Sequence, residues 1–172
     1  MSTKPLDHHV AIVTGAARGI GAAIAQRLAA DGAHVIVNYA TSAKPAEETV
    51  ALITKAGGKA VALQADVSDA GSVAKLFDAA EKAFGPVTTL VNNAGVYDER
   101  LVEKDDEAHF EKVFHANVLG PLLTTAEFAR RYKGKSGRVV NISSGAARAA
   151  LVGGGVYCAS KAALEGLTRV HA

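Results

Sequence analysis

The stretch TGAARGIG, residues Thr14 to Gly21, follows a short apolar run and precedes an Ala-rich segment of helical character. Gly15 permits a tight turn, while Gly19 and Gly21 let the backbone approach a phosphate and let a helix pack on a strand. A helix that begins at such a turn directs its N-terminal amides at an anion. The stretch therefore predicts a pyrophosphate-binding turn between a first strand and a first helix, whereas a glycine cluster elsewhere would indicate an ordinary turn.

The rest of the chain repeats this strand-to-helix alternation. Short runs rich in Val and Ile alternate with longer Ala-rich segments, and runs that are apolar on both faces indicate strands covered on both sides. We expect strands at 9–14, 34–39, 60–65, 87–92 and 137–142. We expect helices near 18–31, 43–56, 69–84, 105–133 and 156–171. The pattern predicts an α/β fold, a three-layer doubly wound parallel sheet.

Two details of the expected helices can be checked directly. Ser68 is the expected cap of the helix that starts near 69. Pro121 interrupts the long segment 105–133 and, without an N–H, cannot donate to the carbonyl of Asn117. We therefore expect a kink that frees the Asn117 carbonyl as an acceptor for water.

Composition narrows the possible classes of protein. With 172 residues, 49% of them hydrophobic and 21% charged, the chain is expected to form one domain over 1–172. A net charge of +2 argues against nucleic-acid or membrane surfaces, and there is no signal-peptide or membrane-spanning pattern. Cys158 is the only cysteine, which excludes an internal disulfide or a multi-cysteine metal site and favours a reducing, cytoplasmic location.

Further motifs follow in a fixed order. NNAG occupies 92–95 after the fourth expected strand, Asn117 lies in the next helix, Ser144 ends the fifth strand, and YCASK occupies 157–161. Together with the T-G-x-x-x-G-x-G turn, this arrangement resembles the short-chain dehydrogenase/reductase family, in particular its 3-oxoacyl-carrier-protein reductase-like members. The resemblance covers essentially the whole chain and implies a Rossmann-like sheet with strand order 3-2-1-4-5, the family's strands 6 and 7 being absent.

The spacing of Tyr157 and Lys161 suits acid–base chemistry. Reduction of a carbonyl needs a proton donor, and a phenol with a pKa near its usual value of about 10 is poorly matched to neutral pH. A cation four residues later, on the same helical face, would depress that pKa. By resemblance Tyr157 is the proton donor or acceptor, Lys161 also binds the nicotinamide ribose, Ser144 orients the substrate carbonyl and Asn117 holds a water linked to Lys161.

Each of these residues also has an ordinary structural interpretation. Tyr and Lys at this spacing occur on many helix surfaces, Ser144 could simply end a strand, and Asn117 could be a solvated helix residue. NNAG could be a turn, and Cys158 is interpreted as a small residue beside Tyr157. Only their joint arrangement favours the catalytic interpretation.

The resemblance also assigns the cofactor contacts. It places them at Gly15, Arg18, Gly19, Ile20, Gly21, Asn38, Tyr39, Ala40, Asp66, Val67, Asn93, Ala94, Gly95, Tyr157 and Lys161. Asp66 is expected near the adenine, with a helix cap as the alternative. No acid occurs in NYATS, 38–42, where one usually binds the ribose 2′-hydroxyl of NAD, and Arg18 could pair with a 2′-phosphate. NADP(H) is therefore favoured over NAD(H), a solvent-facing Arg18 being the alternative.

Two functional hypotheses remain. The first is an NADPH-dependent carbonyl reductase, with a 3-oxoacyl thioester as one candidate substrate. The second is a cofactor-binding or structural fragment without turnover, because the resemblance implies a C-terminally incomplete chain whose strand 137–142 forms an exposed sheet edge. An epimerase or dehydratase of the extended family is disfavoured, since its glycine spacing is G-x-x-G-x-x-G.

The expected partners follow from the same resemblance. They are a small carbonyl or alcohol substrate and, in the complete protein, further copies in a dimer or tetramer. The basic cluster ARRYKGK, 129–135, could dock an acyl carrier protein, or it could be a solvated helix end.

Overall fold

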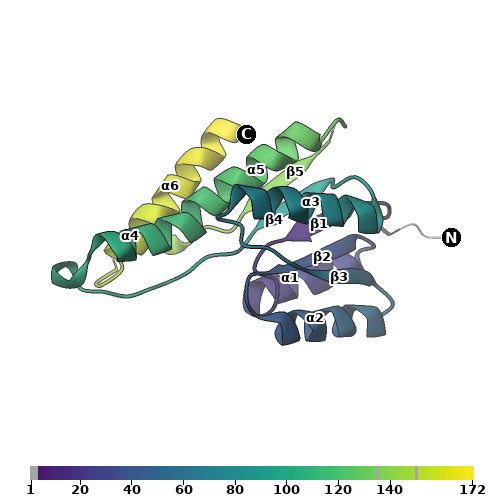
Figure 1. Cartoon of the computed structure of the whole chain (residues 1–172), viewed down its shortest axis with the longest axis horizontal. Helices are drawn as coiled ribbons and strands as arrows, with labels where there is room; N and C mark the ends of the chain where they lie inside the picture. Colours follow the sequence, from purple (N-terminus) through teal and green to yellow (C-terminus); the bar gives the residue numbers. More distant parts are fainter. Residues whose placement is uncertain (1–3, 135, 150) are drawn as a thin grey trace.

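The computed structural model describes residues 4–134, 136–149 and 151–172. Its centre is a parallel sheet of five strands in the order β3-β2-β1-β4-β5 (Figure 1). This confirms the expected α/β class and strand order. The strands are β1 Val10–Val13, β2 His34–Tyr39, β3 Lys59–Gln64, β4 Thr89–Asn92 and β5 Arg138–Asn141.

Helices connect the strands and cover the sheet on both faces (Figure 1). They are α1 Gly19–Ala30, α2 Ala43–Lys55, α3 Ala70–Phe84, α4 Glu107–Phe114, α5 Gly120–Arg131 and α6 Gly155–His171. Short helical segments add η1 Val102–Lys104, the π-helical η2 His115–Leu119 and η3 Gly145–Ala147. None of the helices in the described parts of the chain combines the length and the apolar character that crossing a bilayer would require.

The core follows the alternation of side chains along a strand. In β1, Val10 and Ile12 pack with residues of α3 and α5, whereas Ala11 and Val13 pack with residues of α1 and α2. All four are at most 3% exposed. The strand is apolar throughout because helices cover both of its faces, as its sequence predicted.

The expected single helix over 105–133 is wrong in detail. The structure divides it into α4, η2 and α5. In η2 the register widens, and the Gly120 N–H donates to the carbonyl of His115, five residues back. Pro121 follows at once, in the first turn of α5, where a missing N–H is best tolerated. The disturbance is therefore a π-helical turn that contains Asn117, and the proposed role of the Asn117 carbonyl stays a prediction.

The expected cap of α3 is also wrong. Asp69, not Ser68, is the N-cap, and its carboxylate accepts from the Ser72 N–H at 2.6 Å. Ser68 is engaged elsewhere, because its hydroxyl donates to Asp66 at 2.7 Å. Sequence proximity alone could not distinguish two adjacent capping residues.

Strand β5 is the edge of the sheet next to β4. Within it, Val139 is 37% exposed and Val140 is 47% exposed. The expected apolar edge is thus confirmed for the described part of the chain, and such an edge is prone to pairing with another chain.

Candidate active site

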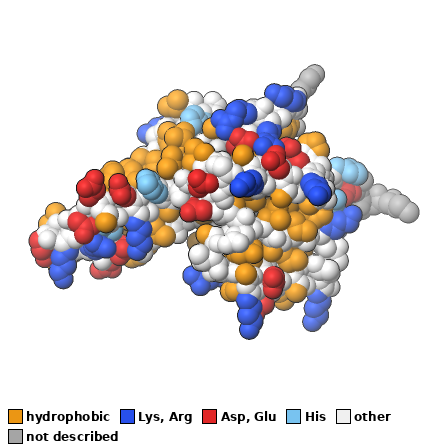
Figure 2. Space-filling model, in the orientation of Figure 1, with side chains coloured by type: hydrophobic (Ala, Val, Ile, Leu, Met, Phe, Trp, Pro, Cys, Tyr) orange, Lys and Arg blue, Asp and Glu red, His pale blue; other side chains and the backbone are white. Residues whose placement is uncertain are grey.

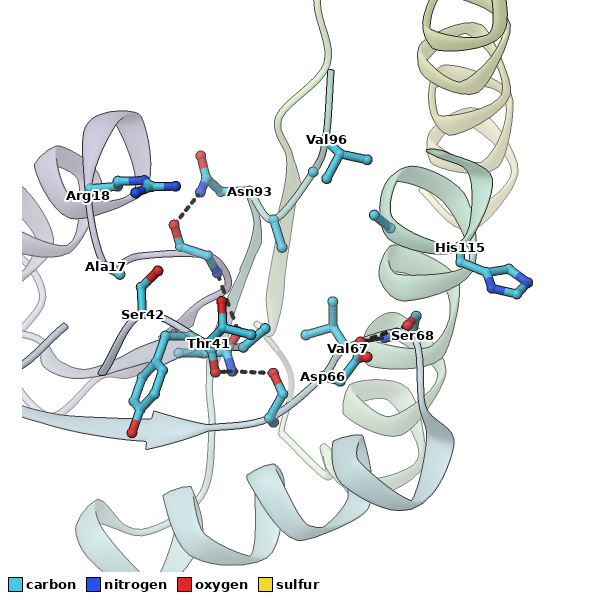
Figure 3. Close-up of a pocket in the computed structure, with 18 of the residues that line it drawn as sticks. Ala17, Arg18, Thr41, Ser42, Asp66, Val67, Ser68, Asn93, Val96 and His115 are labelled. Carbon is cyan, nitrogen blue, oxygen red and sulfur yellow. Dashed lines mark hydrogen bonds between the residues drawn. The ribbon is translucent and has the colours of Figure 1, made fainter. Parts of the chain in front are cut away.

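A cleft of about 630 Å³ opens at the carboxyl ends of the sheet strands (Figure 3). This is where ligands bind in doubly wound folds, because the loops after neighbouring strands meet there. Ten of the residues assigned to the cofactor line it: Gly15, Arg18, Asn38, Tyr39, Ala40, Asp66, Val67, Asn93, Ala94 and Gly95. The sequence interpretation missed nine others that also line it: Ala17, Thr41, Ser42, Ala65, Ser68, Val96, Lys112, His115 and Ala116.

The glycine turn has the geometry that a phosphate cradle needs. Gly15 has φ +60°, and a Cβ added there would lie 2.8 Å from the Cα of Ala94. Gly21 is buried, and its added Cβ would overlap the Asn93 amide and lie 2.7 Å from the carbonyl oxygen of Gly15. Gly19 opens α1, so the helix N-terminus points at the turn. The residues present therefore fit a pyrophosphate, although Gly19, Ile20 and Gly21 do not themselves line the cleft.

The NNAG motif supports this turn from the next strand. The Asn93 side chain donates to the carbonyls of Thr14 at 2.9 Å and Gly15 at 3.1 Å. The Thr14 hydroxyl accepts from the backbone amides of Asn93 and Ala94, each at 3.0 Å. The motif thus braces the cradle as well as lining the cleft.

Asn38 reaches the cleft but uses its side chain inside the fold. Its Oδ1 accepts from the Gly15 N–H at 3.3 Å, and its Nδ2 donates to the carbonyls of Leu63 at 3.3 Å and Ala65 at 3.1 Å. The residue is only 1% exposed. An aspartate would lack the N–H groups that satisfy these carbonyls, so the acid typical of NAD sites does not suit this position.

Polar groups gather at the β2 end of the cleft. Arg18 is exposed at the N-cap position of α1, and Figure 3 shows it on the same side of the cleft as Ser42. Thr41 lies beside Ser42 on the chain and also lines the cleft. In the sequence, the only indication that Thr41 and Ser42 belong to the site was the absence of an acidic residue in 38–42.

Asp66 does not cap α3, although its exposed side chain lines the cleft. Its carboxylate accepts from the Ser68 hydroxyl at 2.7 Å and from the Ser68 N–H at 2.9 Å. These hydrogen bonds hold the pKa of Asp66 below its ordinary value. Asp66 therefore shapes the loop after β3, and Val67 beside it is 7% exposed on the cleft wall.

Tyr157 and Lys161 lie on α6, and neither is among the residues that line the cleft. The ammonium of Lys161 is 5.8 Å from the centre of the Tyr157 ring and donates to the carbonyl of Ile142 at 2.9 Å. Lys161 is 5% exposed, and burial lowers its pKa. A Cβ added to Gly95 would lie 3.6 Å from the ammonium, so Lys161 is next to a residue that lines the cleft. The two side chains predicted to act together are thus brought together.

Ser144 and Asn117 have structural partners. The Ser144 hydroxyl accepts from the Ala146 N–H at 3.2 Å and caps η3. Asn117 is fully buried; its amide donates to Val96 O and Ser160 Oγ, each at 3.0 Å, and its Oδ1 accepts from the Val96 N–H at 2.8 Å. Because Ser160 precedes Lys161, Asn117 ties the loop after β4 to the helix that carries the lysine.

Substitution of Asn117 by alanine should destabilise the fold as well as the site. It would leave the partly buried N–H and C=O of Val96 without their partners, and each loss costs about 1–3 kcal/mol. We expect the free energy of unfolding in urea, without added nucleotide, to fall by about 2–4 kcal/mol. Gln64→Ala is the control, since this exposed amide makes one bond to Ala40 O and should cost under about 1 kcal/mol. An unchanged urea midpoint in the Asn117 variant would contradict the structural role.

Comparisons with known proteins all point to one family. A family profile described as short chain dehydrogenase matches residues 9–172. An uncharacterized oxidoreductase of Methylorubrum extorquens is 47% identical over 167 residues, covering 97% of this chain and 67% of that protein. An NADPH-dependent aldehyde reductase-like protein of Arabidopsis thaliana, described as chloroplastic, is 40% identical over 181 residues, covering 98% of this chain and 67% of that protein.

Solved structures of similar proteins indicate the same family. A short chain dehydrogenase from Burkholderia cenocepacia in complex with NADP superposes with a TM-score of 0.91 at 40% identity, over 96% of this chain and 67% of that one. A dehydrogenase/reductase from Sinorhizobium meliloti superposes with a TM-score of 0.92 at 38% identity, over 96% and 66% of the two chains. The chain therefore spans about two thirds of the length of these relatives.

Proposed function

The chain belongs to the short-chain dehydrogenase/reductase family, and on this basis we propose that it transfers a hydride between NADP(H) and a carbonyl or alcohol substrate. One observation carries the proposal: the buried ammonium of Lys161, held by Ile142 O, lies one helical turn from Tyr157 and next to Gly95, which lines the cleft. A buried cation without a structural carboxylate partner is expensive and is typical of functional sites.

In the proposed reaction each side chain has a separate task. The nicotinamide, when bound, supplies or accepts the hydride. In reduction the Tyr157 hydroxyl donates its proton to the developing alkoxide, and in oxidation the same oxygen accepts it. Lys161 stabilises the phenolate that Tyr157 leaves behind, and Ser144 orients the carbonyl oxygen. Asn117 acts by holding α6 against the loop after β4.

The preference for NADP(H) is supported by the β2 end of the cleft. Arg18 and the hydroxyls of Thr41 and Ser42 supply donors there, and residues 38–42 contain no carboxylate to repel a 2′-phosphate. Two similar proteins are named for NADPH dependence or were solved with NADP. The donors on this chain and the names of its relatives thus point in the same direction.

Arg18→Ala tests this preference. Loss of a charge-assisted contact should raise the dissociation constant for NADPH about 10–100-fold and change that for NADH by less than about threefold. Both constants can be measured from nucleotide fluorescence. Arg27→Ala is the control, because Arg27 lies on the same helix but pairs with Asp31 at 2.8 Å. Equal weakening of both nucleotides by Arg18→Ala would refute a 2′-phosphate contact.

A small carbonyl compound is the favoured substrate over a thioester on an acyl carrier protein. Of the basic cluster 129–135, Arg130 and Arg131 already pair with Glu127, and Arg131 also pairs with Asp78 at 2.7 Å. Lys133 donates to the carbonyl of Arg130 at 2.9 Å, as a cation at a helix end does. Lys135 lies outside the described residues. The arginines of the cluster therefore form ion pairs within α5 and between α5 and α3, which argues against a role in binding a carrier protein.

Nucleotide binding without turnover is the second candidate function. It is favoured by the exposed Val139 and Val140 of β5, the strand at the edge of the sheet. Titration with NADPH, followed by NADPH oxidation with a panel of neutral ketones and aldehydes, separates the two. Binding with carbonyl-dependent oxidation supports the reductase, and saturable binding without oxidation supports the second candidate.

A further inference from the structure

Beyond the cleft, the loop after β4 is joined to the loop before α6. The Arg100 N–H donates to the carbonyl of Gly153 at 2.9 Å. Gly153 has φ +72°, and a Cβ added there would lie 2.8 Å from the Cγ of Glu99. The side chain of Glu99 is thus packed over a glycine of the second loop. This contact fixes where Glu99 lies relative to α6, which begins two residues later at Gly155.

Tyr97 links Glu99 to Tyr157, the proposed proton donor. Its ring meets the ring of Tyr157 edge to face, with centres 4.9 Å apart and an interplanar angle of 78°. Its hydroxyl donates to Glu99 Oε2 at 3.0 Å. Partial burial and this hydrogen bond raise the pKa of Tyr97, so its phenol stays protonated and does not compete with Tyr157 as a base. Tyr157 therefore has Lys161 on one side and Tyr97 on another.

The same corner carries apolar surface and an acidic charge. Tyr97 is 49% exposed, and Leu151 and Val152 of the second loop are exposed as well. The nearby cations do not neutralise Glu99, because Arg100 pairs with Asp98 and Asp106, and Lys112 pairs with Asp98. Figure 2 shows acidic side chains gathered around this projecting end of the molecule, with basic ones among them.

Building on the proposed function, we propose that Tyr97 and Glu99 determine substrate specificity, selecting neutral carbonyl compounds with an aromatic or apolar group and rejecting anionic ones. An aryl group beside the reacting carbonyl would rest against the exposed part of the Tyr97 ring. A carboxylate or phosphate on the substrate would approach the exposed carboxylate of Glu99, and the like charges would repel. Tyr97 also positions the ring of Tyr157.

The test uses two aryl aldehydes that differ in the group opposite the aldehyde, and the Glu99 variant isolates the effect of its charge. Methyl 4-formylbenzoate and 4-formylbenzoate carry the same aryl aldehyde, neutral in the ester and anionic in the acid. We expect kcat/KM with NADPH to favour the ester by about tenfold or more, and Glu99→Gln, which still accepts from Tyr97, to reduce this ratio about fivefold. Glu103→Gln, in η1 of the same acidic segment, should leave the ratio unchanged. Tyr97→Leu should lower kcat/KM for the ester more than for butane-2,3-dione, which has no ring.

Equilibrium binding separates this inference from the proposed function. The two aldehydes are titrated by calorimetry into the complex of each variant with NADP⁺, where no turnover occurs. The specificity role is supported if the wild type binds the ester more tightly than the acid and if Glu99→Gln reduces the ratio of the two affinities. This holds even if the chain never oxidises NADPH. Equal affinities for the two aldehydes, or a ratio that Glu99→Gln leaves unchanged, would overturn it even if the chain is an active reductase.

Discussion

Tyr157→Phe is expected to lower kcat for carbonyl reduction by about 10²–10⁴-fold, the range that a positioned general acid supplies. The hydroxyl is the proposed proton donor, and no other tyrosine in contact with it can replace it, because the Tyr97 phenol donates to Glu99. The ring itself remains, so its packing against Tyr97 and its distance from Lys161 should be kept. NADPH affinity should therefore change by less than about threefold.

Stopped-flow measurement of NADPH oxidation, with fluorescence titration of the nucleotide, checks both parts of this prediction. Tyr132→Phe is the matched control, because the Tyr132 hydroxyl accepts from the Ser136 N–H beyond α5, away from the cleft. Its turnover should equal that of the wild type. Near-normal turnover in Tyr157→Phe would remove Tyr157 from the mechanism and leave the family membership without a catalytic counterpart in this chain.

Gly21→Ala is expected to abolish measurable NADPH binding, with a loss of affinity of at least about 100-fold. The new Cβ would overlap the Asn93 amide and approach the carbonyl oxygen of Gly15, so the turn and the motif that braces it must separate. Overpacking of this kind typically costs about 1–3 kcal/mol in stability as well.

Gly57→Ala provides the control for a general glycine effect. Gly57 has φ +80° but no atom within 4 Å of an added Cβ, so the substitution should cost about 1 kcal/mol and leave NADPH affinity unchanged. Thermal unfolding with and without NADPH measures both quantities. If Gly21→Ala binds NADPH as the wild type does, the turn is not the phosphate site.

Much of the fold could be predicted because its signals are local. Val- and Ile-rich runs marked β1 and β2 to within one residue, and the glycine turn marked the start of α1. The strand order came from the resemblance, and the pairing of the strands confirmed it. The choice between adjacent capping residues could not be predicted. Ser68 and Asp69 have similar capping preferences, and only the structure shows that Asp69 accepts from the Ser72 N–H while Ser68 donates to Asp66.

The sequence by itself determined the alternation of strands and helices, the glycine turn before α1 and the proximity of Tyr157 to Lys161, because each depends on neighbours within a few residues. Only the tertiary structure decided what the buried amides do. Asn38 and Asn117 were expected at the cofactor and the reaction centre, yet their side chains bond to Ala65 and to Val96 and Ser160. It likewise placed Tyr97, which donates to Glu99, against Tyr157, sixty residues further along the chain. A hydrogen bond or a ring contact between such distant residues depends on how complete elements pack, and no local preference encodes that.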